Sequence, residues 1–174
     1  QRDFFQNVIK PYIDKETAVF VIISDALRYE SGEELCSRLL QTDKCEAKIE
    51  PMVATLPTYT KAGMASLLPH KELSCDIESN AIFADNQSVE GTAARNTLLA
   101  TVLNGKGCAV TFEEFRQKTT EFGRDWVKPF KVVYVYHNAI DKAGDDNVSE
   151  SKVFEATEQA FKDIQDILKT IYNM

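Results

Sequence analysis

Hydrophobic and polar positions along the chain follow two alternating patterns. Short apolar runs predict strands at residues 17–24, 47–55, 81–85, 108–112 and 131–138. Apolar residues spaced three and four apart predict helices at residues 2–13, 29–41, 61–68, 92–103, 113–126 and 149–172. Strands that alternate with helices predict an α/β fold, with a mostly parallel sheet covered by helices on both faces. No repeat or long linker divides this pattern, so we expect a single domain over residues 1–174.

The bulk composition is that of a soluble globular protein, with 44% apolar and 27% charged residues. A formal net charge of −7 argues against a surface that binds nucleic acid through general positive charge. The same net charge is compatible with a local basic cleft. The 4 cysteines have neither CxxC nor zinc-finger spacing, which favours free thiols in a reducing compartment. With no signal peptide and no apolar run of the roughly 18 residues that span a membrane, we expect a cytoplasmic protein without a membrane partner.

In an α/β sheet of this kind, ligands bind beyond the carboxyl ends of the strands. This rule selects the segments that follow the first, second and last strands, at residues 24–30, 55–63 and 137–147. The turn at residues 85–88 is a fourth and weaker candidate.

The first two segments each carry one residue with an open interpretation. Asp25 stands where the first strand ends; its carboxylate could bind a cation, but a cap for a helix at residues 27–40 is the simpler interpretation. Thr60 directly precedes a short helix, whose N–H groups suit an anionic substrate or a threonine alkoxide, although a threonine cap is again simpler. Lys61 is either a phosphate ligand or a surface lysine, and we expect Arg95 to pair with Glu90.

The third segment places Asp141, Asp145 and Asp146 around a glycine, just past a strand. Such a group makes a hard-cation site plausible, and an acidic surface loop is about as plausible. His137 is flanked by apolar residues, which indicates a hydrogen-bonded structural histidine. A total of 2 histidines argues against a self-contained zinc site.

Taken together, three blocks of sequence resemble the alkaline phosphatase superfamily and, in the detail of their residues, its PglZ branch. The blocks read VFVIISDALRYE from Val19, ATLPTYTKAGMASLLP from Ala54 and VVYVYHNAIDKAGDD from Val132. PglZ proteins are known from the BREX type of bacterial phage defence. The resemblance therefore implies an alkaline-phosphatase-like core and partners among other phage-defence proteins.

By position, the resemblance implies metal ligands at Asp25, Thr60, Asp141 and Asp145, with Thr60 as the catalytic nucleophile. The implied cofactors are divalent ions, zinc or manganese, with magnesium as a further candidate. Relatives in the superfamily have His at the place of Asp145, and the added oxygen donor favours Mn²⁺ or Mg²⁺ over zinc.

The superfamily completes its two-metal site with a later Asp-His-Gly motif and a final His, and this chain contains neither. The chain also begins without Met and ends within a helical pattern. We therefore expect a truncated core that lacks its C-terminal part, an incomplete metal site, and little or no activity of this fragment alone.

Two functional classes follow for the parent protein. The first is a metal-dependent phosphodiesterase or phosphatase, acting on a nucleotide, a nucleic acid or another phosphoester through a phosphothreonine. The second is a catalytically inactive binding or scaffold component of a defence or signalling complex. A flavodoxin-like receiver would explain Asp25 but not the helix at Thr60.

Overall fold

The computed structural model describes residues 1–42, 45–145 and 150–174. These residues form two compact units, one made of residues 1–21 and 53–136 and the other of residues 22–52 and 137–174. The chain passes from one unit to the other inside two of its strands, after Val21 and after Tyr136. Each unit therefore combines segments that are far apart in the sequence.

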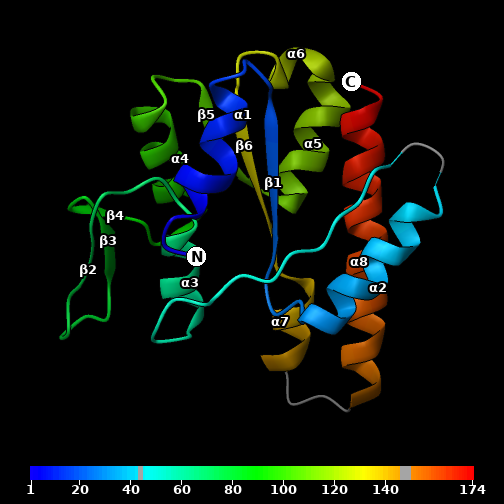
Figure 1. Cartoon of the computed structure of the whole chain (residues 1–174), viewed down its shortest axis with the longest axis horizontal. Coiled ribbons are helices and arrows are strands. Elements are labelled where there is room, and N and C mark those ends of the chain that lie inside the picture. Colours follow the sequence, from blue (N-terminus) through cyan, green and yellow to red (C-terminus); the bar gives the residue numbers. More distant parts are fainter. Residues whose placement is uncertain (43–44, 146–149) are drawn as a thin grey trace. The chain divides into compact units, whose positions relative to one another are not determined.

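The main sheet has three strands, in the order β1-β6-β5 (Figure 1): β1 (Val19–Ser24), β6 (Val132–His137) and β5 (Gly107–Thr111). β5 and β6 pair in parallel, with Gly107 opposite Val132 and Thr111 opposite Tyr136. β6 is buried along its whole length, as expected for a continuous apolar strand between two neighbours. The predicted α/β fold with a parallel sheet flanked by helices is confirmed.

β1 runs in the same direction as β6. The Val19 N–H donates to the Lys131 carbonyl at 2.8 Å, and the Asp25 N–H donates to the His137 carbonyl at 2.9 Å. From the first of these bonds to the second, β1 and β6 each advance by six residues in the same direction, as two parallel strands do.

A second, antiparallel sheet contains β2 (Leu73–Cys75), β3 (Ile82–Ala84) and β4 (Gln87–Ser88) in that order. Asp85 and Asn86 join β3 to β4 with φ values of 47° and 65°. Two successive left-handed residues make the tight hairpin turn that matches the twist of the flanking strands. The candidate turn at residues 85–88 is therefore explained by the hairpin.

The first unit also contains the π-helix η1 (Phe5–Ile9) and the helices α1 (Lys10–Ile13), α3 (Thr60–Ser66), α4 (Gly91–Val102), α5 (Phe112–Phe122) and α6 (Arg124–Val127). α5 begins with a capping box, in which Thr111 Oγ1 accepts from the Glu114 N–H and Glu114 Oε2 accepts from the Thr111 N–H. On one side of the sheet, Phe115 packs edge-on against Phe20 and Trp126. Tyr134 is fully buried and its hydroxyl donates to the Leu67 carbonyl at 2.7 Å, just past the end of α3.

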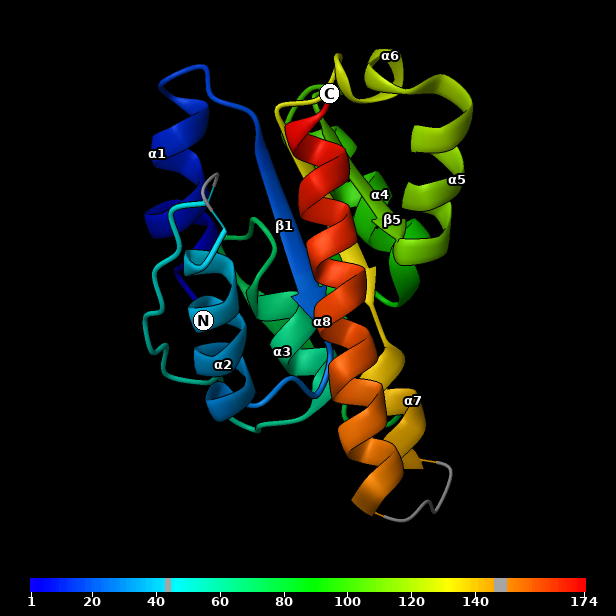
Figure 2. The same ribbon diagram turned by 90° about the vertical axis from the view of Figure 1, so that its right-hand side faces the viewer.

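The second unit contains α2 (Tyr29–Leu40), α7 (Ala139–Asp145) and α8 (Glu150–Tyr172). Figures 1 and 2 show α2 beside α8, and their contact is apolar at Leu35, Phe161 and Ile164. Arg38 adds a polar contact, because its guanidinium bonds Glu158 of α8 at 2.6 Å and stacks on the Phe161 ring. No helix of either unit, in the ranges that the structure describes, is long and apolar enough to cross a membrane.

Two predictions about local structure are wrong. Residues 47–55 form no strand, and Met52, Val53 and Ala54 are exposed, Val53 by 87%. Residues 139–145 of the predicted loop form the helix α7, which starts two residues after the end of β6. The predicted free thiols are confirmed for Cys36, Cys45, Cys75 and Cys108.

Candidate metal and phosphoester site

Asp25 follows the last residue of β1 and starts a sharp turn. Its Oδ1 accepts from the Ala26 N–H at 3.0 Å, and Ala26 has a φ of 62°, which few residues with a Cβ adopt. α2 begins only at Tyr29, with Arg28 at the N-cap, so the interpretation of Asp25 as the cap of a helix from residue 27 is wrong. The half-buried carboxylate therefore stands at the strand end, where an α/β sheet presents its ligands.

Asp141 lies in the first turn of α7 and is half-buried. The turn is closed by the Lys142 N–H, which donates to the Asn138 carbonyl at 3.2 Å. Since Asp25 bonds the backbone of His137, the two carboxylates come from adjoining strand ends of the same unit. Asp145 is the last residue of α7, and Asp146 lies outside the described residues.

Thr60 belongs to the other unit and is the first residue of α3, after Tyr59 at the N-cap. Thr60 is exposed, whereas Ala62, Met64 and Ala65 further along the helix are buried. Thr60 is thus inside the helix rather than its cap, on an element that is anchored by its apolar face. This arrangement leaves the hydroxyl at the surface of the unit.

Lys61, next to Thr60, forms an ion pair of 2.6 Å with Glu90. The hydrogen bond from Lys61 holds the pKa of Glu90 below its ordinary value, and the same bond raises the pKa of Lys61. The predicted pair between Arg95 and Glu90 is replaced by this one. Arg95 donates to the Val89 carbonyl instead and lies 4.6 Å over the Tyr136 ring.

His137 joins three elements of the second unit. The residue is buried; the Nδ1 of its ring is 3.2 Å from Ser24 Oγ and the Nε2 is 3.0 Å from Asp163 Oδ2. The prediction of a hydrogen-bonded structural histidine is confirmed. Sequence reasoning missed Ser24 and Asp163, because Asp163 looks like any polar position of the amphipathic helix α8.

The donor chemistry fits a hard divalent cation in part. Asp25 and Asp141 offer carboxylate oxygens, which Mg²⁺ and Mn²⁺ prefer. Within residues 1–42, 45–145 and 150–174, however, no three His, Cys, Asp or Glu side chains gather as a metal site requires. The carboxylates of Asp25 and Asp141 can therefore supply some ligands of such a site but do not complete one by themselves.

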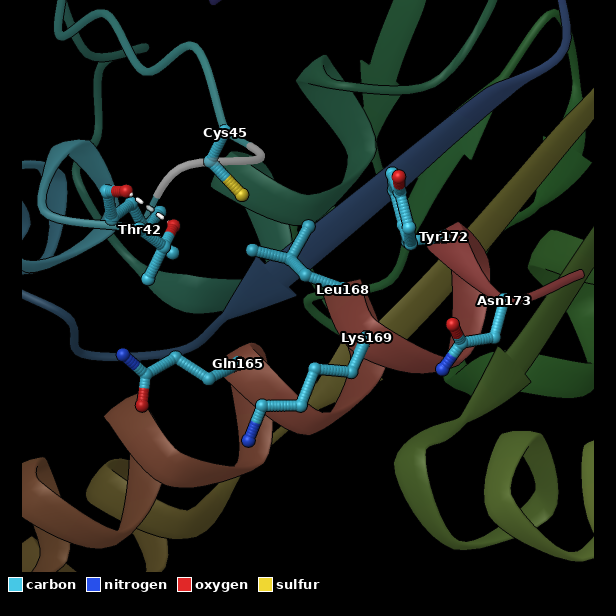
Figure 3. Close-up of a pocket in the computed structure, with 8 residues that line it drawn as sticks. Thr42, Cys45, Gln165, Leu168, Lys169, Tyr172 and Asn173 are labelled. Carbon is cyan, nitrogen blue, oxygen red and sulfur yellow. Dashed lines mark hydrogen bonds between the residues drawn. The ribbon is translucent and has the colours of Figure 1, made fainter.

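A pocket of about 570 Å³ lies in the second unit, between the end of α2 and the C-terminal part of α8. Figure 3 shows Cys45 and Leu168 extending into the same space, with Thr42 and Tyr172 nearby. None of the predicted site residues belongs to its lining, which is Leu39, Thr42, Cys45, Gln165, Leu168, Lys169, Tyr172 and Asn173.

The parallel α/β sheet, with acidic residues after its strands, agrees with an alkaline phosphatase-like domain. Comparison with known families gives the same class and a narrower one: the family described as "BREX system PglZ alkaline phosphatase-like domain" matches residues 4–174. The chain belongs to this PglZ family.

Two curated relatives match nearly the whole chain. The alkaline phosphatase-like protein BrxZ of Escherichia coli O9:H4 (strain HS) is 38% identical over 177 aligned positions, covering 99% of this chain. The alkaline phosphatase-like protein PglZ of Bacillus cereus (strain H3081.97) is 36% identical, also over 99% of this chain. The chain spans 20% of the length of each relative. No solved structure matches it significantly.

Proposed function

We propose that this chain contributes the nucleophile and part of a two-metal site to a phosphodiesterase or phosphatase of a BREX phage-defence system. The observation that carries the proposal is the hydrogen bond between Asp25 and His137, which supports a shared role for the carboxylates of Asp25 and Asp141 in an alkaline phosphatase-like domain. The substrate class is a phosphoester, with nucleotides and nucleic acids as candidates. The expected location is the cytoplasm, among other phage-defence proteins.

In the proposed reaction, the Thr60 hydroxyl loses its proton to solvent and its oxygen forms a bond to phosphorus, while the bond to the leaving oxygen breaks and that oxygen takes up a proton from solvent as an alcohol. Water then hydrolyses the phosphothreonine and restores the threonine. Asp25 and Thr60 would bind one divalent ion, and Asp141 and Asp145 would bind the other. When bound, such ions lower the pKa of the attacking hydroxyl and neutralise charge on the phosphoryl group.

Lys61 has a supporting place in this proposal. Its charge is held next to Thr60 by the exposed ion pair with Glu90. A phosphoryl group that reaches Thr60 would compete with Glu90 for the ammonium. Lys61 would then orient the anion, without itself taking part in bond making.

A second candidate function is a binding or scaffold component without hydrolysis. The observation that favours it is Asp145, which stands where the superfamily has a histidine. A missing nitrogen ligand would weaken zinc binding more than binding of a hard cation.

The test uses the full-length protein with bis(p-nitrophenyl) phosphate and Mn²⁺ or Zn²⁺. Thr60→Ala should lower kcat by roughly 10³-fold or more, since the covalent step has lost its nucleophile. Thr60→Ser should retain part of the activity, and Thr58→Ala, which removes a nearby exposed hydroxyl, should match the wild type. Activity retained by Thr60→Ala would exclude Thr60 as the nucleophile. A wild type that is inactive with both Mn²⁺ and Zn²⁺ would favour the scaffold function.

A further inference from the structure

We infer that His137 and Asp163 are positioning residues, which hold the turn at Asp25 and the start of α7 in the arrangement that metal binding requires. The inference rests on the proposed function, because it concerns the same two carboxylates. It assigns a role to a buried histidine and to a carboxylate on α8 that the proposed reaction does not itself use.

The first observation is that one residue, His137, makes two separate bonds to the end of β1. Its carbonyl oxygen accepts from the Asp25 N–H at 2.9 Å, and its Nδ1 lies 3.2 Å from Ser24 Oγ. Ser24 and Asp25 are consecutive, so backbone and side chain of His137 hold adjoining positions of the strand end. The Asp25 carboxylate is attached to this doubly held segment.

The second observation is that α8 holds the ring of His137 from the other side. Asp163 Oδ2 lies 3.0 Å from Nε2, and its Oδ1 accepts from Gln159 Nε2 at 2.9 Å. An ionised carboxylate only accepts hydrogen bonds, so Nε2 carries a proton. In the neutral ring, Nδ1 is then the acceptor and the Ser24 hydroxyl donates to it. Asp163 thereby sets the direction of the whole chain of hydrogen bonds.

The third observation is burial. The His137 side chain is 2% exposed and that of Asp163 is 14% exposed, so water has little access to these bonds. A buried polar group that loses its partner is costly, and this holds the three groups to one arrangement. His137 also precedes Asn138, whose carbonyl accepts from Lys142 in the first turn of α7. Fixing His137 therefore fixes the beginning of the helix that carries Asp141.

Ser24, His137 and Asp163 stand in the same order as a nucleophile, a base and an orienting acid. A nucleophilic role needs access for a substrate to the hydroxyl and to the ring together. The near-complete burial of the ring opposes such access and favours positioning. Covalent labelling of Ser24 by a fluorophosphonate, abolished in Ser24→Ala, would contradict the positioning role.

The test compares variants of the full-length protein by Mn²⁺ calorimetry, phosphoester hydrolysis and thermal unfolding. Asp163→Asn should weaken Mn²⁺ binding by roughly 10-fold, because partners behind metal ligands usually contribute 10- to 100-fold in affinity. Asp166→Asn is the matched control, since it changes an exposed carboxylate on the same helix that pairs with nearby Lys169. It should bind Mn²⁺ as the wild type does.

Replacing His137 with an amide side chain distinguishes the contribution of the bond at Nε2 from that of the bond at Nδ1. His137→Phe should lose Mn²⁺ affinity, His137→Gln can reach towards Asp163, and His137→Asn can reach towards Ser24. Partial recovery of affinity by an amide, relative to His137→Phe at equal foldedness, supports positioning. If His137→Phe does not fold, Asp163→Asn and His137→Gln still decide the question.

Unchanged Mn²⁺ affinity in folded Asp163→Asn and His137→Phe would overturn the inference, even if both variants unfold at lower temperature. A wild type that binds no Mn²⁺ would overturn it as well. A wild type that binds Mn²⁺ but hydrolyses no phosphoester would contradict only the proposed enzymatic function, because the affinity comparison is independent of turnover.

Discussion

The Asp25 N–H donates to the His137 carbonyl at 2.9 Å, and this bond joins the end of β1 to the end of β6. Their proximity cannot be read from the sequence alone, since 111 residues separate them. The bond brings two segments side by side, and each carries an acidic residue: Asp25 itself in one and Asp141, in the first turn of α7, in the other. In a parallel sheet the segments that follow the strands lie close together, because the carboxyl ends of all the strands lie at one edge.

Metal binding by residues 1–174 alone should be weak, with an apparent Kd for Mn²⁺ above the micromolar range. The reason is that, among the described residues, no three His, Cys, Asp or Glu side chains are grouped so that they could hold a metal ion. Asp25→Asn and Asp141→Asn should each remove what binding there is, as measured by calorimetry. A longer protein that added ligands to these carboxylates should bind at least about 10-fold more tightly.

Asp125→Asn is the control for this titration, because it removes one exposed negative charge from α6. Its affinity should equal that of the unchanged fragment. Submicromolar binding by the fragment that depends on Asp25 would show that residues 1–174 already hold a complete site.

The strand β6 could be predicted from the sequence because burial along its whole length leaves a continuous apolar run, and β1 carries such a run although only Val21 of it is buried. Residues 47–55 also contain apolar residues, but Lys48, Glu50 and Pro51 interrupt them, and no strand forms there. The contact of His137 with Asp163 could not be predicted. This contact depends on how α8 packs in the second unit, and the local sequence pattern does not determine that packing.

Gly107→Ala should destabilise the protein, because α4 passes very close to the start of β5. A Cβ at this position would lie 2.7 Å from the Leu99 carbonyl oxygen and 3.0 Å from its carbon. Backbone atoms of a helix cannot move aside as a side-chain end can, so we expect a loss of roughly 1–3 kcal/mol in the free energy of unfolding. Urea denaturation followed by the fluorescence of Trp126 measures it.

Gly63→Ala provides the comparison for Gly107→Ala. Gly63 lies within α3, and a Cβ there would meet nothing within 4 Å. Alanine is the better helix former by up to about 1 kcal/mol, so this variant should be as stable as the wild type or slightly more stable. Equal effects of the two substitutions would contradict the close approach of α4 to β5.

Asp85 should make stability depend on pH in the acid range. The N–H of Glu72, and after it that of Lys71, donate to the Asp85 carboxylate and hold its pKa below the ordinary value. A carboxyl group whose pKa is lower in the folded state stabilises fully above its unfolded pKa of about 3.9. This contribution is lost as the pH falls through the lower folded value.

Asp85→Asn isolates this charge, because asparagine also tolerates the left-handed φ of 47° and keeps one acceptor oxygen. At pH 7 the variant should unfold at a lower urea concentration than the wild type, by a modest amount since the carboxylate is exposed. The difference between the two proteins should begin to shrink as the pH falls below about 4, where Asp85 of the unfolded chain takes up a proton, and should vanish below the lower pKa of the folded state. Asp125→Asn, which removes an exposed charge outside the hairpin, should show no such convergence. A difference between Asp85→Asn and the wild type that stays constant from pH 7 to pH 2 would mean that the two N–H bonds do not depend on the charge of Asp85.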